Sequence, residues 1–443
     1  MHITRLCTRR MAFARGHKAP VCVATACKLR WTFRTHRGNE KVCVEPEERK
    51  WGMKVFEAIA PVERIATDPN GDRPSEGMAL CLSGGGYRAM LFNLGALWRL
   101  NECCYLPRLK RVSSVSGGSI TAAALGLAWG RLDFDESGRA RRFNEEVTLP
   151  LRNLAGKTID VGAVLRGLFG PGTINDALAR QYGKHLYGHK TLQHLPADTE
   201  GPRFVINATN VQSGALWRFS RPYAQDWRVG QVRDPGFEVA VAVAASSALP
   251  PYLSPAVLHI PASAYSEVAG TDLHYAPFTT RVVLTDGGVS DCLGIETAWK
   301  RFSTILVSDG GGKISPEKKP HRLWPSHTLR VLAMMDDQRR SRRKMQVMSS
   351  FTRAHDQIGH RYGAYWSTRS DIKEYGLPDS LECPLSQTAR LADLPSRLSR
   401  LGPRVQEQLV NWGYAVCDAA LRRYVAPTLP APRDFPYPAA GVG

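Results

Sequence analysis

A serine followed by two glycines stands where a short apolar run changes into a stretch of small residues. Residues 109–126 read LKRVSSVSGGSITAAALG, a pattern typical of a strand that turns directly into a helix. Gly-x-Ser-x-Gly at such a turn is the nucleophile elbow, where small neighbours are needed because the backbone is strained and crowded. Here Ser114 replaces the first glycine and Ser116 is the candidate nucleophile, although the same short pattern also occurs in flexible connections.

A second run of small residues precedes this segment. Residues 83–88 read SGGGYR and lie between a short apolar run, residues 78–82, and a helical pattern. The N–H groups of consecutive glycines can converge on an anion. One interpretation is a dinucleotide-binding loop, because Gly84, Gly86 and Ala89 fit G-x-G-x-x-A. That interpretation requires an acid about 20 residues further on, at the end of the next strand, and this strand ends in SSVS instead.

The other interpretation of the glycine loop is an oxyanion hole. The N–H groups of Gly85 and Gly86, together with that of Gly117 after the serine, would stabilise the negative oxygen of a tetrahedral intermediate. Because neighbouring parallel strands end at the same edge of a sheet, we expect the loop and Ser116 to lie together. Two weak patterns in this spatial relationship favour acyl transfer more strongly than either pattern does by itself.

A serine hydroxyl needs a group that accepts its proton before it attacks a carbonyl carbon. The twelve histidines offer no obvious candidate at the end of a predicted strand. Asp286 closes an apolar run and is followed by two glycines, and Asp309 has equivalent surroundings in the sequence VSDGGG. A carboxylate at the C-terminal end of a parallel strand could approach the edge that carries Ser116. Both aspartates are therefore candidate bases, and each could equally be a turn-forming acid.

These candidate groups lie on alternating strands and helices. Residues 76–102 predict a strand, a glycine loop and a helix, and residues 109–129 predict a second strand and helix. Such a unit implies parallel strands with helices on the faces of the sheet. Further buried strands are predicted at residues 203–211, 281–288 and 303–312. Residues 150–200 and 330–425 are mostly helical in pattern.

Composition and charge restrict the class of protein. The chain has 443 residues, a net charge of +19 and 43% hydrophobic residues, which is typical of a globular protein. Its longest apolar stretch, residues 239–256, is broken by Pro250 and Pro251, so we expect a soluble, cytoplasmic protein. The basic residues 1–50 contain no apolar core of a secretory signal and are expected to be a disordered extension. None of the ten cysteines forms a CxxC pair, so no zinc site is predicted.

Three spaced motifs in this order resemble those of the patatin-like phospholipases, a family of lipid acyl hydrolases with a Ser–Asp dyad. The motifs are GGGYR at residues 84–88, SVSGG at residues 114–118 and DGG at residues 286–288. The resemblance runs from about residue 79 to residue 299 and includes the segments NATNVQSGALWRFS and AASSALPPYLSP. Residues 408–425 further resemble the C-terminal extension of bacterial members of that family.

The resemblance implies a three-layer α/β/α sandwich with a mostly parallel central sheet and a helical C-terminal extension. It implies that Ser116 is the nucleophile and that Asp286, rather than Asp309, accepts its proton. The oxyanion hole is expected from Gly84, Gly85, Gly86, Arg88 and Gly117. The expected organisation begins with a basic extension at residues 1–50 and a catalytic domain at residues 76–300. A helical extension packed on the core, at residues 301–425, and a Pro-rich tail, at residues 426–443, follow.

The expected function is hydrolysis of ester bonds in glycerophospholipids, of phospholipase A or lysophospholipase type, through an acyl-enzyme. No metal or organic cofactor is implied, because a dyad and an oxyanion loop suffice for acyl transfer. Two alternatives remain open, namely a Ser–His–Asp carboxylesterase and a catalytically silent lipid- or nucleotide-binding module on the same fold. The basic run at residues 337–346 fits either a solvated helix face or peripheral contact with anionic lipid headgroups. No RNA- or DNA-binding motif accompanies the basic residues, so no nucleic-acid partner is expected.

Overall fold

The apolar run that ends at residue 82 forms a central strand of a mixed sheet. The computed structural model of the protein describes residues 74–169, 172–312, 314–320, 323–354 and 359–443. The predicted basic extension, residues 1–50, therefore lies outside the described residues.

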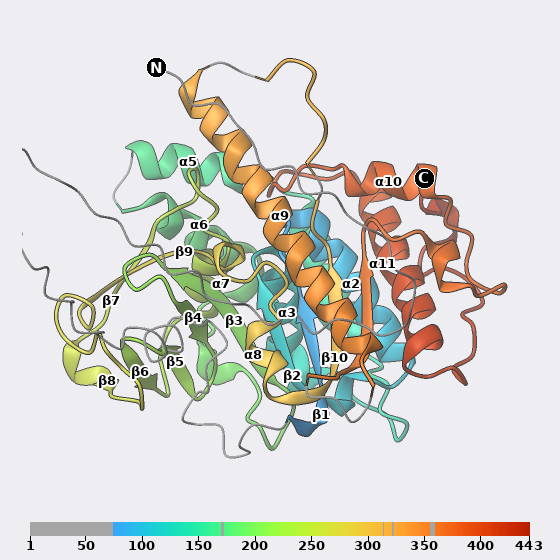
Figure 1. The fold of residues 1–443 in the computed structure, drawn as a ribbon, viewed down its shortest axis with the longest axis horizontal. Coiled ribbons are helices and arrows are strands. Elements are labelled where there is room, and N and C mark those ends of the chain that lie inside the picture. Colours follow the sequence, from blue (N-terminus) through green and yellow to red (C-terminus); the bar gives the residue numbers. More distant parts are fainter. Residues whose placement is uncertain (1–73, 170–171, 313, 321–322, 355–358) are drawn as a thin grey trace, which may run out of the picture. The chain divides into compact units, whose positions relative to one another are not determined.

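Parallel strands make up the half of the sheet that carries the glycine loop. Their order is β11–β10–β1–β2–β3, and neighbouring strands of this set are parallel (Figure 1). Beyond β3 the sheet continues through short antiparallel strands, and β9 pairs with both β3 and β7. The strands are β1 (Ser75–Leu82), β2 (Leu109–Val115), β3 (Arg203–Asn210), β4 (Leu216–Phe219), β5 (Tyr223–Asp226), β6 (Gly230–Arg233), β7 (Ala256–His259), β8 (Tyr265–Ser266), β9 (Arg281–Asp286), β10 (Phe302–Asp309) and β11 (Tyr362–Ser367).

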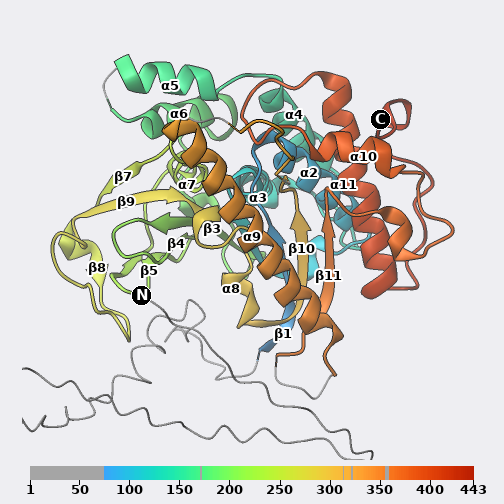
Figure 2. The same cartoon turned by 45° about the horizontal axis from the view of Figure 1, so that its top comes forward.

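Helices cover both faces of this sheet, as alternation along β1 requires. Leu80 and Leu82 pack with the helices on one face, whereas Ala79 and Cys81 pack on the other with residues of α8 and α9. Figures 1 and 2 show α9 crossing in front of the sheet, with α2, α3 and α11 behind it. The helices are α2 (Gly86–Glu102), α3 (Gly117–Ala128), α4 (Leu149–Ala155), α5 (Asp160–Phe169), α6 (Ile174–Tyr182), α7 (Val239–Ser246), α8 (Glu296–Trp299), α9 (Trp324–Thr352), α10 (Leu385–Ala392) and α11 (Pro403–Tyr424). The predicted three-layer α/β/α fold with a mostly parallel centre is thus confirmed.

Helix α11 fixes α2, the helix that follows the glycine loop, through two close backbone contacts. A Cβ atom added to Gly95 would lie 2.0 Å from the carbonyl oxygen of Val410. One added to Gly413 would lie 1.9 Å from that of Phe92. Because no larger residue fits at either point, these glycines let the two helix backbones touch, and α2 is held against the sheet.

Residues 301–425 differ from the predicted helical extension. They contribute β10 and β11 to the central sheet as well as α9, α10 and α11. The resemblance ended near residue 299 and did not include these strands, although the apolar pattern at residues 303–312 predicted the first of them.

The Pro-rich segment 426–443 is also not a free tail. The side-chain amide of Asn411, on α11, donates to the carbonyl oxygens of Tyr437 and Gly441, both at 2.8 Å. Val442 is buried against the main core. Composition alone suggested an unstructured tail, but its apolar side chains find a surface on α11.

Among the residues that the structure describes, no helix is both long enough and apolar enough to cross a bilayer.

Candidate active site

Ser116 occupies a strained turn between a buried strand and a buried helix. Strand β2 ends at Val115 and helix α3 begins at Gly117, which leaves Ser116 alone at the junction with φ 50° and ψ −121°. A non-glycine residue with positive φ is costly and persists only where surrounding contacts enforce it. One such contact is the Ser116 N–H, which donates to the Ser246 hydroxyl at 2.9 Å. The side chain is partly exposed at the end of the strand, as a nucleophile elbow requires.

Small residues allow the glycine loop to touch this turn. Leu82 and Ser114 are paired residues of the parallel strands β1 and β2, so the loop and the turn follow side by side. A Cβ atom on Gly117 would lie 2.3 Å from the carbonyl oxygen of Gly86, and one on Gly84 would lie 2.9 Å from Cβ of Ser116. The structure thus brings together the two motifs that the sequence analysis expected at one edge of the sheet.

Several backbone N–H groups beside Ser116 are available to a ligand. Gly85 has φ 146° and Gly86 has φ 60°, conformations that L side chains rarely adopt. Within the described part of the chain, the N–H groups of Gly85, Gly86 and Gly117 donate to no protein acceptor. Unpaired N–H groups next to a nucleophilic oxygen are the donors that an oxyanion hole needs.

Asp286 reaches Ser116 from a direction that differs from the prediction. Strand β9 runs antiparallel to β3, not parallel to it, and it meets the end of β2 head-on. Val115 pairs with Asn207, and Asp286 pairs with the next residue of β3, Ala208. Two strands that end on consecutive residues of a third strand bring their last side chains together. The Ser116 side chain accordingly lies beside the Asp286 carboxylate, close enough to lower its pKa.

The surroundings of Asp286 make its carboxylate a stronger base than usual. The side chain is 5% exposed, and its Oδ1 accepts the N–H of Gly288 at 2.7 Å. Burial raises the pKa of Asp286 to about 6, because desolvation disfavours the charged form, and the hydrogen bonds from Gly288 and Ser116 limit the rise. A Cβ on Gly287 would lie 2.3 Å from the carbonyl oxygen of Asn207, so the DGG sequence lets the turn close tightly on β3.

Asp309, the rival base, is engaged elsewhere. It lies at the end of β10 and forms an ion pair with Arg340 of α9. It also accepts hydrogen bonds from the Ser83 hydroxyl at 3.0 Å and the Tyr365 hydroxyl at 2.8 Å. Burial by itself would raise the pKa of Asp309, but Arg340 and the hydrogen bonds hold that pKa below the ordinary value. A carboxylate held ionised by an arginine is a poor proton acceptor, so Asp309 has a structural role.

No histidine of the described residues hydrogen-bonds to Ser116 or Asp286. The rings that have partners bond elsewhere, for example His185 to Lys157 and His194 to Thr191. The arrangement therefore does not favour a Ser–His–Asp triad. The described residues also contain no group of three or more metal-ligating side chains.

The guanidinium of Arg88 is occupied by protein partners beside the predicted oxyanion hole. It donates to the carbonyl oxygens of Gly310 and Leu394 and to the hydroxyl of Ser396. Burial lowers the pKa of Arg88 to about 10, and the nearby Arg340 adds to this effect. Arg88 therefore ties the start of α2 to two distant loops.

A group of buried hydroxyl and amide groups under Ser116 was not predicted from the sequence. The Ser246 hydroxyl donates to the Asn207 carbonyl oxygen at 2.6 Å, and it lies 3.0 Å from the Ser119 hydroxyl. The Asn207 side chain donates to the carbonyl oxygen of Ser114 at 2.9 Å. Ser246 lies in the AASSALPP segment, where paired serines in an otherwise apolar run were the available signal.

Comparisons with known proteins identify the family that the chain resembles. Residues 80–299 match the family described as patatin-like phospholipase. No curated protein matches the chain. Among solved structures, human GIVD cytosolic phospholipase A2 is similar with a TM-score of 0.48 and 15% identity, over 77% of this chain and 60% of that one. The human protein in complex with methyl gamma-linolenyl fluorophosphonate gives a TM-score of 0.49 and 16% identity, over 78% and 57%.

A bacterial structure is more distant. VipD from Legionella pneumophila has a TM-score of 0.32 and 14% identity, over 79% of this chain and 67% of that one. The chain thus spans less than two thirds of the length of the human structures that it resembles.

Proposed function

Since residues 80–299 make this chain a member of the patatin-like phospholipase family, we propose that it hydrolyses carboxylic ester bonds of glycerophospholipids. Ser116 is the nucleophile and Asp286 is the base. The observation that carries the proposal is the register of β3, which pairs Val115 and Asp286 with consecutive residues and so places Ser116 beside a buried carboxylate.

The reaction would proceed through an acyl-enzyme. Asp286 takes the hydroxyl proton as Oγ of Ser116 bonds to the ester carbonyl carbon, and the N–H groups of Gly85, Gly86 and Gly117 bind the resulting oxyanion. The intermediate then breaks its bond to the alcohol oxygen, which receives the proton from Asp286. Water attacks the acyl-serine by the same route and releases the fatty acid, which restores the Ser116 hydroxyl.

The pKa of Asp286 suits both halves of this cycle. A carboxyl group with a pKa near 4 is a weak base for a serine hydroxyl. With the value raised to about 6, Asp286 is ionised at neutral pH yet binds the transferred proton more readily. Burial of the carboxylate is therefore the feature that allows a dyad to act without an imidazole.

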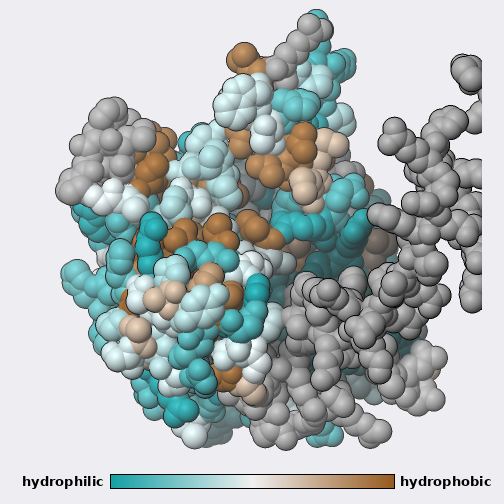
Figure 3. Space-filling model, turned by 60° about the vertical axis from the view of Figure 1, so that its left-hand side comes forward, coloured by the Kyte–Doolittle hydropathy of each residue, from teal (hydrophilic) through white to brown (hydrophobic). Residues whose placement is uncertain are grey.

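Exposed apolar side chains support contact with a lipid surface. The protruding end of α9 carries several of them, and Figure 3 shows apolar surface there: Leu323, Trp324, Leu332, Met334 and Met335. Trp324 is 78% exposed, which is unusual for tryptophan in a folded protein. Apolar residues gathered on an exposed surface are typical of interfacial binding.

A second group of exposed apolar residues lies close to the dyad. Leu249 follows Ala248, whose carbonyl oxygen accepts the N–H of Asp286, and Val289 ends the turn after Asp286. A substrate would thus meet apolar side chains at the entrance to the reacting groups, as expected for an acyl chain.

The proposal is tested by incubating the purified full chain with phosphatidylcholine vesicles and measuring released fatty acid and lysophospholipid by mass spectrometry. We expect both products in equal amounts at first, because one ester bond is cleaved per turnover. A peptide substrate of similar size is the control and should remain intact. If no phospholipid or lysophospholipid offered releases fatty acid, the proposal is wrong. The result would then favour the alternative of a catalytically silent lipid- or nucleotide-binding module.

The pH dependence of hydrolysis should follow the titration of Asp286. Since protonated Asp286 cannot accept the serine proton, kcat/KM for a neutral p-nitrophenyl ester should fall about tenfold per pH unit below the pKa of about 6 and level off above it. If the base were an exposed carboxylate, kcat/KM would begin to fall only near pH 4. A profile that stays flat down to that pH would exclude Asp286 as the base.

A further inference from the structure

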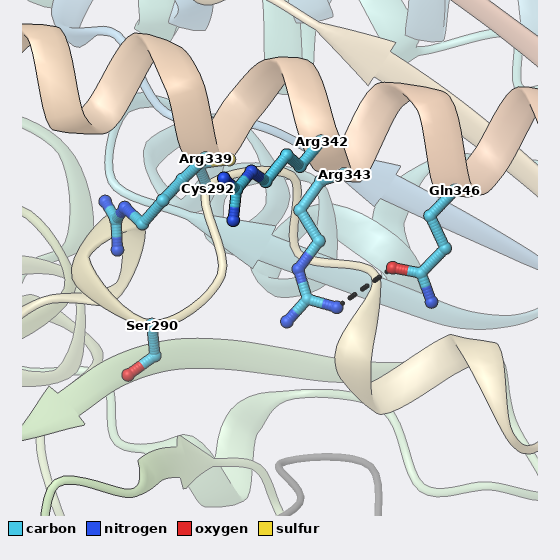
Figure 4. A pocket seen from close by; sticks show the side chains of 6 residues that line it. All are labelled: Ser290, Cys292, Arg339, Arg342, Arg343 and Gln346. Atoms are coloured by element: carbon cyan, nitrogen blue, oxygen red, sulfur yellow. Dashed lines mark hydrogen bonds between the residues drawn. The ribbon is translucent and has the colours of Figure 1, made fainter. Parts of the chain in front are cut away.

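Helix α9 presents three arginines along one face, above a pocket of about 340 Å³. Arg339, Arg342 and Arg343 are spaced by three and four residues, as is Gln346, so all four project on the same side. Figure 4 shows Arg339, Arg343 and Gln346 reaching from α9 toward the segment that carries Ser290. The wall opposite the arginines is formed by Ser290 and Cys292.

Among the residues that the structure describes, Arg342 and Arg343 use little of their hydrogen-bonding capacity, whereas Arg339 is bonded to Gly288 and Asp336. Arg342 is exposed and makes no hydrogen bond or ion pair with any other residue that the structure describes. Arg343 donates to Gln346 at 3.1 Å and lies 4.0 Å from the carboxylate of Glu296. Each guanidinium has five N–H donors and no acceptor, so the pocket offers many donors and a concentrated positive charge.

The acids around the pocket neutralise this charge only in part. Glu296 is shared between Arg343 and the buried Arg218, at 4.0 and 3.9 Å. Burial raises the pKa of Glu296 to about 7, so this carboxyl group carries only part of a charge at neutral pH. Nε and Nη1 of Arg218 are buried and have no hydrogen-bond partner in the described part of the chain. Asp336 is paired with Arg339 at 2.7 Å. The buried Asp291, between Ser290 and Cys292, is a further acid that interacts with Arg343.

The pocket adjoins the reacting groups. Nη2 of Arg339 donates to the carbonyl oxygen of Gly288 at 2.8 Å, and the N–H of Gly288 donates to Asp286 at 2.7 Å. A ligand held by the arginines would therefore lie beside the turn that carries the base. Arginine is suited to phosphate because its planar group can donate two parallel hydrogen bonds to it.

We propose that Arg339, Arg342 and Arg343 bind the phosphate group of an anionic phospholipid at the membrane surface. The inference rests on the proposed function, since it identifies the class of lipid that the same site prefers. The exposed apolar residues of α9 lie on the helix that presents the arginines, so one helix would contact both the acyl region and the headgroups.

Binding is measured on the Ser116→Ala protein, so that substrate turnover does not interfere. Sedimentation with phosphatidylcholine vesicles, with and without phosphatidic acid, gives the affinity. We expect phosphatidic acid to strengthen binding, and Arg342→Gln combined with Arg343→Gln to weaken it about tenfold on those vesicles, because two charge-assisted hydrogen-bonding groups are lost. Thermal unfolding checks that each variant is folded.

Arg404→Gln combined with Arg423→Gln is the matched control, because both arginines are exposed on α11 and the net charge changes equally. If the pocket variant and the control lose the same affinity for the vesicles, the proposal is wrong, and binding depends only on the net positive charge. Competition with inorganic phosphate tests whether the pocket binds a lipid headgroup or free phosphate. If it saturates the pocket by calorimetry while phosphatidic acid adds nothing to vesicle binding, the lipid assignment is wrong. Because no step here requires hydrolysis, an inactive wild-type protein would contradict the proposed function alone.

Discussion

Ser116→Ala is expected to lower the rate of ester hydrolysis by about 10⁴-fold or more, since it removes the atom that forms the acyl-enzyme. The neighbouring N–H groups and Asp286 remain, but they have no nucleophile to assist except water. The measurement is kcat/KM for a p-nitrophenyl ester together with fatty acid release from vesicles. A fluorophosphonate probe should label the wild-type protein once and leave the variant unlabelled, because the probe requires a nucleophilic serine.

The fold should not change in this variant. Alanine takes the same backbone conformation as serine, and the N–H of residue 116 can still donate to Ser246. Ser137→Ala is a matched control, because Ser137 is exposed and its hydroxyl bonds only within its own loop and to Cys104. If Ser116→Ala and Ser137→Ala retain similar activity, another residue is the nucleophile.

Asp286→Asn is expected to lower activity by about 10³-fold or more, because an amide cannot take the serine proton. The same change should stabilise the fold. The pKa of Asp286 is raised by burial to about 6, so the ionised carboxylate is less favourable in the folded chain than in the unfolded chain. Its replacement should therefore raise the free energy of unfolding at pH 8 by up to about 3 kcal/mol. The gain should disappear below pH 4, where both states are protonated.

Asp309→Asn is the informative control for this experiment. The pKa of Asp309 is held low by Arg340 despite burial, so its charge favours folding and its loss should lower the melting temperature. A higher melting temperature for Asp286→Asn and a lower one for Asp309→Asn would show that the Asp309 carboxylate stabilises the fold and the Asp286 carboxylate does not. A destabilised Asp286→Asn protein with unchanged activity would contradict the role proposed for Asp286.

The local part of the site could be predicted from the sequence. Ser116 and the three glycines at 84–86 each stand at the junction of a strand and a helix, and short-range patterns identify such junctions well. Parallel pairing of β1 and β2 followed from the helix between them, because that connection requires it. These features depend on residues near one another in the chain.

The long-range part could not be predicted in the same way. Asp286 and Asp309 both end a strand before two glycines, and only the pairing partners distinguish them. The direction of β9 depends on the path of the chain through β7, which no local pattern determines. Arg88 shows the same limit, since its partners at Gly310 and Leu394 come from distant loops.

Val115 and Asp286 pair with adjacent residues of β3. Because of this pairing, the distance between the Ser116 hydroxyl and the Asp286 carboxylate does not depend on the surface loops. Surface loops between the elements can lengthen, shorten or acquire new side chains while the distance between hydroxyl and carboxylate stays the same. An insertion of one residue between Asn207 and Ala208 would shift one partner by about 3.3 Å along the strand and break their contact. Changes in these loops can therefore alter what binds beside Ser116 and Asp286 without moving the two side chains apart.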